Sequence, residues 1–340
     1  MQEYTVAVVG IGMVGGQMLR VLRERNFPAK ETRVLATRAR KEVVHGHEYD
    51  VIPASVEAFD GVDFAFFAGT EGSKGASQQY GWAAAERGCI VIDNGDDFRM
   101  DDRVPLVVPE VNPEHLERHQ GFIANPNCST IQMVVALAPL HRKAGIKRIV
   151  VSTYQAVSGT GRAAVAELEH QVEDYAADRK LQHEVYPHQI AFNCIPQVSS
   201  LKDQFPGYYG EEIKMIREPR KMFDAPDLAV SATCVRVPVF NSHSEAINVQ
   251  FEGKMTAEMA TEILSEAPGV KVVDDPGNSV YPLALDASGD DDVLVGRIRQ
   301  DTSTENCIDL WCVADNIVKG AALNAVQIAE KLIEMGLVKK

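Results

Sequence analysis

The sequence has 340 residues, of which 45% are apolar, and its formal net charge at neutral pH is −14. This length favours two domains over one, and the acidic balance without a basic cluster argues against nucleic acid or an anionic membrane surface as a partner. No apolar run approaches the roughly 20 residues that a membrane-spanning helix requires, so no membrane partner is expected.

Six cysteines, at positions 89, 128, 194, 234, 307 and 312, are scattered and form no C-x-x-C pair. Neither a zinc site nor a disulfide framework is therefore predicted, and no bound metal is expected. The chain enters a strand within its first few residues, which is not the pattern of a signal peptide. These features predict a cytoplasmic protein with reduced thiols.

The first expected strand covers residues 5–9, and a helix-periodic pattern is established by residue 18. Between them lies the turn from Gly10 to Gly15, with the sequence Gly-Ile-Gly-Met-Val-Gly and hence the pattern G-x-G-x-x-G. Glycines at this spacing allow a tight turn and a close approach of backbone N–H groups to a pyrophosphate. The turn predicts dinucleotide binding; the alternative is a glycine-rich turn in an α/β fold without a cofactor.

The second expected strand covers residues 33–36 and leads into Thr37, Arg38 and Arg40. A site that prefers NAD usually has an acidic residue at the end of this strand for the ribose hydroxyls, and none is present here. Arg38 and Arg40 instead offer cations for a 2′-phosphate. We therefore predict NADP over NAD; the alternative for these cations is a solvated loop.

Further strands are expected at residues 62–68, 89–94 and 106–112, with a helix that ends near residue 87. Strands that alternate with helices are typical of a parallel, doubly wound sheet. The N-terminal part is therefore predicted to be a Rossmann-type α/β domain.

The stretch Asn125-Pro126-Asn127-Cys128-Ser129-Thr130-Ile131 joins a strand-like segment to a helix expected at residues 129–145. Asn127 is a candidate N-cap, which places Cys128 at a helix N-terminus. The helix dipole and free N–H groups there favour the thiolate, and the thiolate is the nucleophile in covalent catalysis. Cys128 is therefore a candidate nucleophile; the alternative is a buried structural cysteine.

The pattern changes beyond this helix. A strand is expected at 148–157, a turn at 158–161, a helix at about 162–178 and an irregular stretch at 179–226, followed by β runs at 227–239, 244–252, 269–274, 291–299 and 307–314. These runs predict a second α+β domain with a mixed or antiparallel sheet, and a last helix at 317–335 is expected to return to the first domain. The expected domains are residues 1–127 with 317–340, and residues 128–316.

Three features of the second domain are candidates for chemistry. Arg236 lies inside an apolar strand, and a buried guanidinium needs a carboxylate or phosphate partner, which could be a ligand or an internal Asp or Glu. His243 follows seven residues later and could take and return a thiol proton, or be structural. The run from Glu211 to Met215 alone reads as a solvated charged helix face.

Together these motifs resemble the aspartate-semialdehyde dehydrogenase family over nearly the whole chain. The resemblance rests on the glycine turn, the cysteine motif, the Glu-Glu-x-Lys-Met run, the spacing of Arg236 and His243, and the segments at residues 98–100, 109–112, 153–159 and 190–196.

The resemblance implies a role for each matching position. Cys128 would be the nucleophile that becomes an acyl-thioester, His243 the acid/base, and Gln155 the residue that orients substrate and thioester. Arg236 would grip the substrate α-carboxylate and Glu211 would face its amino group. Phosphate would be held by Arg99, Asn127 and Lys214, and NADP by Gly10, Gly12, Met13, Val14, Gly15, Thr37, Arg38, Ser158, Gly159 and Asn316.

The implied reaction is the reversible, NADPH-dependent reductive dephosphorylation of 4-aspartyl phosphate to L-aspartate 4-semialdehyde, in the biosynthesis of lysine, diaminopimelate, threonine and methionine. A thioester accepts hydride where a carboxylate would not, which is why a covalent cysteine is needed. The alternatives are an N-acetyl-glutamyl-phosphate reductase and a non-catalytic NADP-binding paralogue. The second domain would also dimerise, giving a homodimer or a dimer of dimers.

Overall fold

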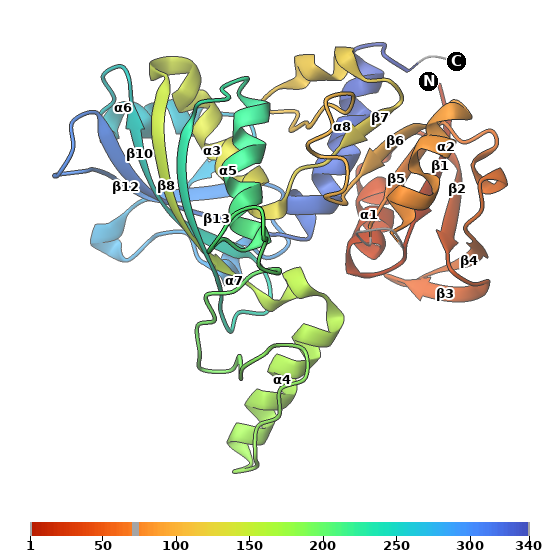
Figure 1. Cartoon of the computed structure of the whole chain (residues 1–340), viewed down its shortest axis with the longest axis horizontal. Helices are drawn as coiled ribbons and strands as arrows, with labels where there is room; N and C mark the ends of the chain where they lie inside the picture. The colour runs from red at the N-terminus through yellow and green to blue at the C-terminus, as the bar shows by residue number, and fades with distance from the viewer. Residues whose placement is uncertain (1, 70–74, 339–340) are drawn as a thin grey trace. The chain divides into compact units, whose positions relative to one another are not determined.

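The computed structural model describes residues 2–69 and 75–338, which form two compact units (Figure 1). The first unit spans Met1–Asn127 and Ala321–Lys340, and the second spans Cys128–Gly320. Residues 1, 70–74, 339 and 340 of the expected domains lie outside the described residues.

A seven-stranded sheet with the order β3-β4-β2-β1-β5-β6-β7 forms the centre of the first unit. Its strands are β1 (Tyr4–Val9), β2 (Ala29–Ala36), β3 (Arg40–Val44), β4 (His47–Pro53), β5 (Phe64–Phe67), β6 (Ile90–Asp93) and β7 (Phe122–Ala124). All neighbouring strands are parallel except β3 and β4. Every residue of β1 and β5 is buried, as expected for central strands that are covered on both faces.

The α-helices of this unit are α1 (Met13–Glu24), α2 (Trp82–Glu86) and α8 (Leu323–Glu334). Short 3-10 or π turns cover Glu57–Phe59, Ser77–Gly81 and Pro113–Arg118. Helix α8, from the end of the chain, packs against α1 and β6, while α2 also packs on β6. The C-terminal helix therefore completes the core that the N-terminal strands begin.

In this unit one predicted strand is wrong and one hairpin was not predicted. The expected strand at 106–112 is wrong, because only Leu106 forms a β-bridge, to Ala124, and the chain then turns. Two prolines flank this apolar stretch, and the Asn112 side chain closes the turn by accepting from Val108 N and donating to Leu106 O. The β3–β4 hairpin was not predicted, although its tip, His45 and Gly46, has the positive φ angles typical of such turns.

The second unit contains a six-stranded mixed sheet with the order β11-β12-β13-β10-β8-β9 (Figure 1). Its strands are β8 (Ile146–Gln155), β9 (Ala229–Arg236), β10 (His243–Phe251), β11 (Val270–Val272), β12 (Val293–Gln300) and β13 (Cys307–Ala314). The pairs β8–β9 and β11–β12 are parallel, and the remaining pairs are antiparallel. The predicted fold class, a Rossmann-type domain followed by a second domain with a mixed sheet, is confirmed.

The helices of this unit are α3 (Cys128–Ala144), α4 (Arg162–Ala176), α5 (Gly210–Met222), α6 (Ala257–Ser265) and α7 (Ala284–Ala287). Helix α3 packs on β8, β10, β12 and β13, and α5 packs on β9. Alternate residues of β10, from His243 to Phe251, are buried on the core face. Within this unit α4 extends away from the sheet (Figure 1).

Each helix in the described part of the chain is too short or too polar to cross a bilayer. Among the same residues, no three His, Cys, Asp or Glu side chains are grouped so as to hold a metal ion.

Candidate active site

Three strand ends of the second unit bring polar side chains to one point of the sheet. Gln155 ends β8 and pairs in register with Arg236, which ends the parallel strand β9. His243 begins the antiparallel strand β10 on the other side of β8. All three side chains are almost completely buried, with exposures of 1%, 5% and 0%. Residues separated by up to 88 positions therefore form one polar cluster at the edge of an apolar core.

Helix α3 begins at Cys128, as predicted, and its first turn lies against this cluster. The next residue, Ser129, accepts a hydrogen bond from Gln155 Nε2 at 2.9 Å. Cys128 is partly exposed, and behind it Gly320 approaches so closely that a Cβ there would lie 2.8 Å from the Cβ of Cys128. Cys128, the candidate nucleophile, therefore lies at the positive end of the α3 dipole, and position 320 beside it has no room for a side chain.

The amide of Gln155 connects α3 to α5. Its Nε2 also lies 3.0 Å from Glu211 Oε1 and 3.3 Å from Thr153 Oγ1. Glu211 is 4% exposed and lies 3.8 Å from Lys214 Nζ, one turn further along α5. The reading of this run as a solvated charged face is therefore wrong for Glu211, which is built into the cluster.

A backbone carbonyl group holds the Arg236 guanidinium. Its Nη1 donates to Ala156 O at 2.6 Å, while its buried Nε has no hydrogen-bond partner within the described part of the chain. No Asp or Glu among those residues forms an ion pair with it, so the internal carboxylate that the sequence left open is not found there. A buried cation with unused donors is suited to binding an anionic ligand.

The His243 imidazole is oriented by the same residue. Ala156 N donates to His243 Nδ1 at 3.0 Å, so the proton of a neutral ring is on Nε2. Burial, with a smaller contribution from the Arg236 charge, holds the pKa of His243 well below its usual value. The ring is therefore neutral in the resting protein, and its buried Nε2–H finds no acceptor in the described residues.

The 3-10 turn η4 (Val157–Thr160) closes over both groups. A Cβ on Gly159 would lie 3.0 Å from Arg236 Nη1 and 3.2 Å from His243 Nε2, so glycine permits this approach. Ser158 Oγ lies 3.1 Å from Asn316 Oδ1, which also accepts from Ser242 N. The predicted cofactor residues Ser158, Gly159 and Asn316 thus lie beside His243.

Two contributors to this cluster were missed by sequence reasoning. Ala156 acts through its backbone, which no motif could reveal. Ser242 has φ of 72°, a left-handed conformation, and its buried hydroxyl has no partner within the residues described. A strained, buried serine next to His243 is a typical sign of a functional segment, and only a structure reveals it.

In the first unit the glycine turn has the geometry that its sequence predicted. Gly10 has φ of 95°, and a Cβ on Gly15 would lie 1.9 Å from Gly10 O, so both positions require glycine. Gly12 precedes α1, is exposed, and no side chain caps the helix N-terminus that begins at Met13 and Val14. The first N–H groups of α1 are therefore available to a phosphate.

The other predicted residues of the first unit form two groups. Thr37 and Arg38 follow β2 and are exposed, and the Arg40 guanidinium is engaged by Glu42 at 2.6 Å. Arg99 is 6% exposed and donates to Asn94 O and Asn125 O, at 2.7 and 3.0 Å. This brings Arg99 to the segment that contains Asn127, which is also buried.

Comparison with known proteins identifies the family. The family models "Semialdehyde dehydrogenase, NAD binding domain" and "Semialdehyde dehydrogenase, dimerisation domain" match residues 5–119 and 137–319. The aspartate-semialdehyde dehydrogenases of Aquifex aeolicus and Bacillus subtilis are 49% and 47% identical over 98% of this chain, covering 99% and 98% of their own lengths. The crystal structure of aspartate semialdehyde dehydrogenase II from Vibrio cholerae, complexed with ASA, is 42% identical, covers 98% of this chain and 99% of its own, and superposes with a TM-score of 0.92. The chain therefore belongs to the aspartate-semialdehyde dehydrogenase family.

Proposed function

We propose that the protein catalyses the reversible, NADPH-dependent reductive dephosphorylation of 4-aspartyl phosphate to L-aspartate 4-semialdehyde. The observation that carries this proposal is the cluster in which the helix turn of Cys128 meets Gln155, Arg236 and His243. The family is one of oxidoreductases that act on an aldehyde, and the V. cholerae relative was solved with ASA. The pathways served would be those of lysine, diaminopimelate, threonine and methionine.

Cys128 is the nucleophile of this reaction. Its thiolate attacks the acyl carbon of the substrate, phosphate leaves with the electron pair of the broken C–O bond, and an acyl-thioester remains on the sulfur. The Nε2–H of His243 donates a hydrogen bond to the carbonyl oxygen and stabilises the negative charge that develops there. NADPH, when bound, would supply a hydride to the thioester carbon; the C–S bond then breaks with its electron pair on sulfur, which releases the aldehyde and returns Cys128 to the thiolate. Gln155, fixed by Ser129 and Glu211, orients the acyl group.

Each charged group of the substrate is bound by residues of opposite charge. Arg236 binds the α-carboxylate with donors that no other described residue uses. Glu211 faces the substrate ammonium group, and Arg99, Asn127 and Lys214 bind the phosphate. A buried carboxylate at position 211 disfavours a substrate whose amino group is acetylated, so N-acetyl-glutamyl phosphate fits the cluster less well.

The cofactor is proposed to be NADP. Its pyrophosphate lies on the turn of Gly10, Gly12 and Gly15 and on the first residues of α1, Met13 and Val14. Thr37 and Arg38 bind the 2′-phosphate, because Arg38 is exposed whereas Arg40 is engaged by Glu42. Ser158, Gly159 and Asn316 contact the nicotinamide end.

The cofactor proposal is tested with R38A and, as a matched control, R40A. R38A should lower kcat/KM for NADP roughly ten- to a hundredfold, the size of one or two charge-assisted hydrogen bonds, and leave NAD unaffected. R40A should leave kcat/KM for NADP and for NAD nearly unchanged. Equal losses in both variants, or an unchanged NADP preference in R38A, would contradict the assignment.

The proposed reaction is tested by phosphate-dependent reduction of NADP with aspartate semialdehyde. The C128A variant should be inactive, whereas C194A, at an exposed cysteine with no part in the proposed chemistry, should retain wild-type activity. Mass spectrometry of enzyme mixed with 4-aspartyl phosphate should show the acyl adduct on the peptide of Cys128. Wild-type protein that binds NADPH but is inert at every pH would favour a non-catalytic paralogue, and activity only with the N-acetylated substrate would favour the reductase.

The assembly is proposed to be a homodimer or a dimer of dimers, formed through the second unit. The name of the family model that covers residues 137–319 supports this assignment. Light scattering coupled to size exclusion, at concentrations around those of the activity assay, would give the mass directly. A monomer with full activity would contradict it.

A further inference from the structure

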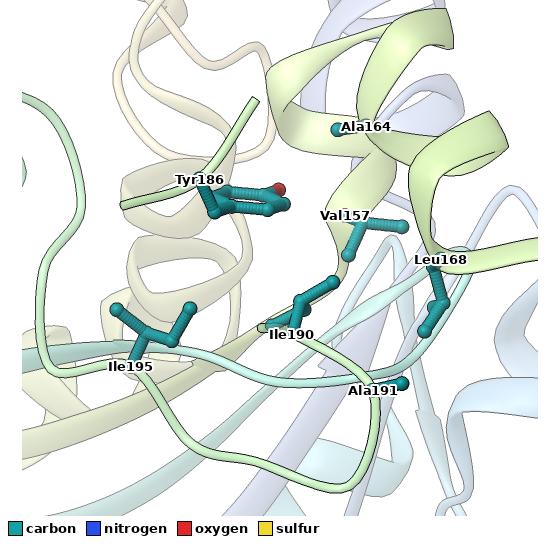
Figure 2. Packing of buried hydrophobic residues seen from close by; sticks show 7 residues of the cluster. All are labelled: Val157, Ala164, Leu168, Tyr186, Ile190, Ala191 and Ile195. Carbon is teal, nitrogen blue, oxygen red and sulfur yellow. The ribbon is translucent and has the colours of Figure 1, made fainter. Parts of the chain in front are cut away.

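In the second unit a small hydrophobic core lies between α4 and the irregular segment at residues 182–196 (Figure 2). Leu168 of α4 packs there with Tyr186, Ile190 and Ile195 of the segment. Val157 is also a member, and it belongs to the turn η4 that closes over Arg236 and His243. The core therefore joins α4 to the candidate active site.

Helix α4 fixes the irregular segment through two buried side chains. The Glu167 carboxylate accepts from the backbone N–H groups of residues 184, 185 and 186, at 2.6, 2.6 and 3.4 Å. Gln171 accepts from Ile190 N and Ala191 N and donates to Gln182 O. These side chains replace the hydrogen-bond partners that a strand or helix would give, so the segment has a defined path.

The segment meets the active site at two points. Ile195 exchanges two backbone hydrogen bonds with Arg236, at 2.9 and 2.8 Å, as a β-bridge beside the end of β9. The Tyr186 hydroxyl donates to Thr160 Oγ1 at 2.9 Å, at the end of η4. Burial raises the pKa of Tyr186, and the Arg236 charge and the hydrogen bond to Thr160 oppose that rise.

The turn held by Tyr186 is the one that encloses the Arg236 guanidinium. Ala156 O, just before the turn, accepts from Arg236 Nη1, and Gly159 lies so close that a Cβ there would be 3.0 Å from the same atom. Gly159 and Thr160 are exposed, so the packing of the main core does not cover this end of the turn. The Tyr186 hydroxyl holds the turn at Thr160, whereas Ser158 is held two residues earlier by Asn241 and Asn316.

We propose that Tyr186 is a positioning residue for Arg236: its hydrogen bond to Thr160 holds the turn at residues 157–160 against the guanidinium that binds the substrate α-carboxylate. Helix α4 and its small core thereby belong to the substrate site. The inference rests on the proposed function, because it takes Arg236 as the carboxylate anchor.

The test is the kinetics of Y186F, which removes only the hydroxyl and leaves the ring in the small core. The KM for aspartate semialdehyde should rise roughly two- to tenfold, the size of one neutral hydrogen bond, while kcat and the KM for NADP stay within about twofold. T160V should give the same change, and the double variant should be no worse than either, because both remove one interaction. Y175F, whose exposed ring packs against Phe192 in a tilted arrangement, is the control and should match the wild type.

A second substrate separates positioning from a general loss of structure. With 3-aminopropanal, which lacks the carboxylate, Y186F and the wild type should have the same kcat/KM. An unchanged KM for aspartate semialdehyde in Y186F, or equal losses with both substrates and a lower melting temperature, would overturn the inference. Wild-type protein that does not oxidise aspartate semialdehyde would refute the proposed function and the inference together, whereas active enzyme with an unaltered Y186F would refute the inference alone.

Discussion

The contact between Gly320 and Cys128 gives a quantitative prediction for G320A. A Cβ at position 320 would lie 2.8 Å from Cys128 Cβ and 3.3 Å from Cys128 Cα. Non-bonded carbons rest at roughly 3.5–4.0 Å, so the two residues must separate by at least roughly 0.7 Å. Since a misplacement of about 1 Å at a reacting group can lower the rate about a hundredfold, we expect kcat to fall roughly ten- to a hundredfold.

The assay combines kcat for NADP reduction with the rate at which iodoacetamide alkylates Cys128, followed by mass spectrometry of its peptide because Cys194 is also exposed. Both rates should fall together. Overpacking should also lower the stability by about 1–3 kcal/mol, seen as a lower melting temperature. The control is G277A, where the nearest atom would be 3.7 Å from the new Cβ and no change is expected. Wild-type kcat and alkylation rate in G320A would refute the reasoning.

Three further predictions concern stability. Glu245 is fully buried, and its carboxylate oxygens have no hydrogen-bond partner of good geometry in the described chain. Burial raises the pKa of Glu245 well above 4.5, although Gln132 opposes that rise. The folded protein therefore loses stability as the pH rises above 4.5, and E245Q should melt higher than the wild type at pH 8 but not at pH 4. The pKa of His243 is lowered instead, so only the unfolded chain gains a proton below about pH 6.5. The melting temperature should therefore fall between pH 7 and pH 5, and less steeply in H243Q; parallel curves would contradict this. Because Ser242 has φ of 72°, S242G should raise the melting temperature by roughly 1–3 °C, whereas S244G, in an extended strand, should lower it.

The outline of the fold could be predicted because it depends on local patterns. The strand, glycine turn and helix at the N-terminus follow from residues within 20 positions of one another, and so does the start of α3 at Cys128. The strand expected at 106–112 was wrong because apolar composition alone does not form a strand where the chain must turn.

The candidate site was less accessible to sequence reasoning. Arg236 was recognisable because a cation in an apolar strand is unusual, but its partner is a backbone carbonyl 80 positions away, and backbone groups leave no trace in a sequence. The contact of Tyr186 with Thr160 depends in the same way on how an irregular segment folds back. The catalytic and binding roles, the cytoplasmic location and the oligomeric state remain predictions.

The double use of Ala156 limits how this enzyme could be engineered. The carbonyl of this one residue holds Arg236, and its N–H orients His243. Ala156 is fully buried, so a larger side chain there would shift the backbone and disturb both contacts together. Proline would in addition remove the N–H that orients His243, although Ala156 already has the φ of −64° that proline needs. Carboxylate binding and the orientation of the imidazole are therefore coupled through a single peptide unit.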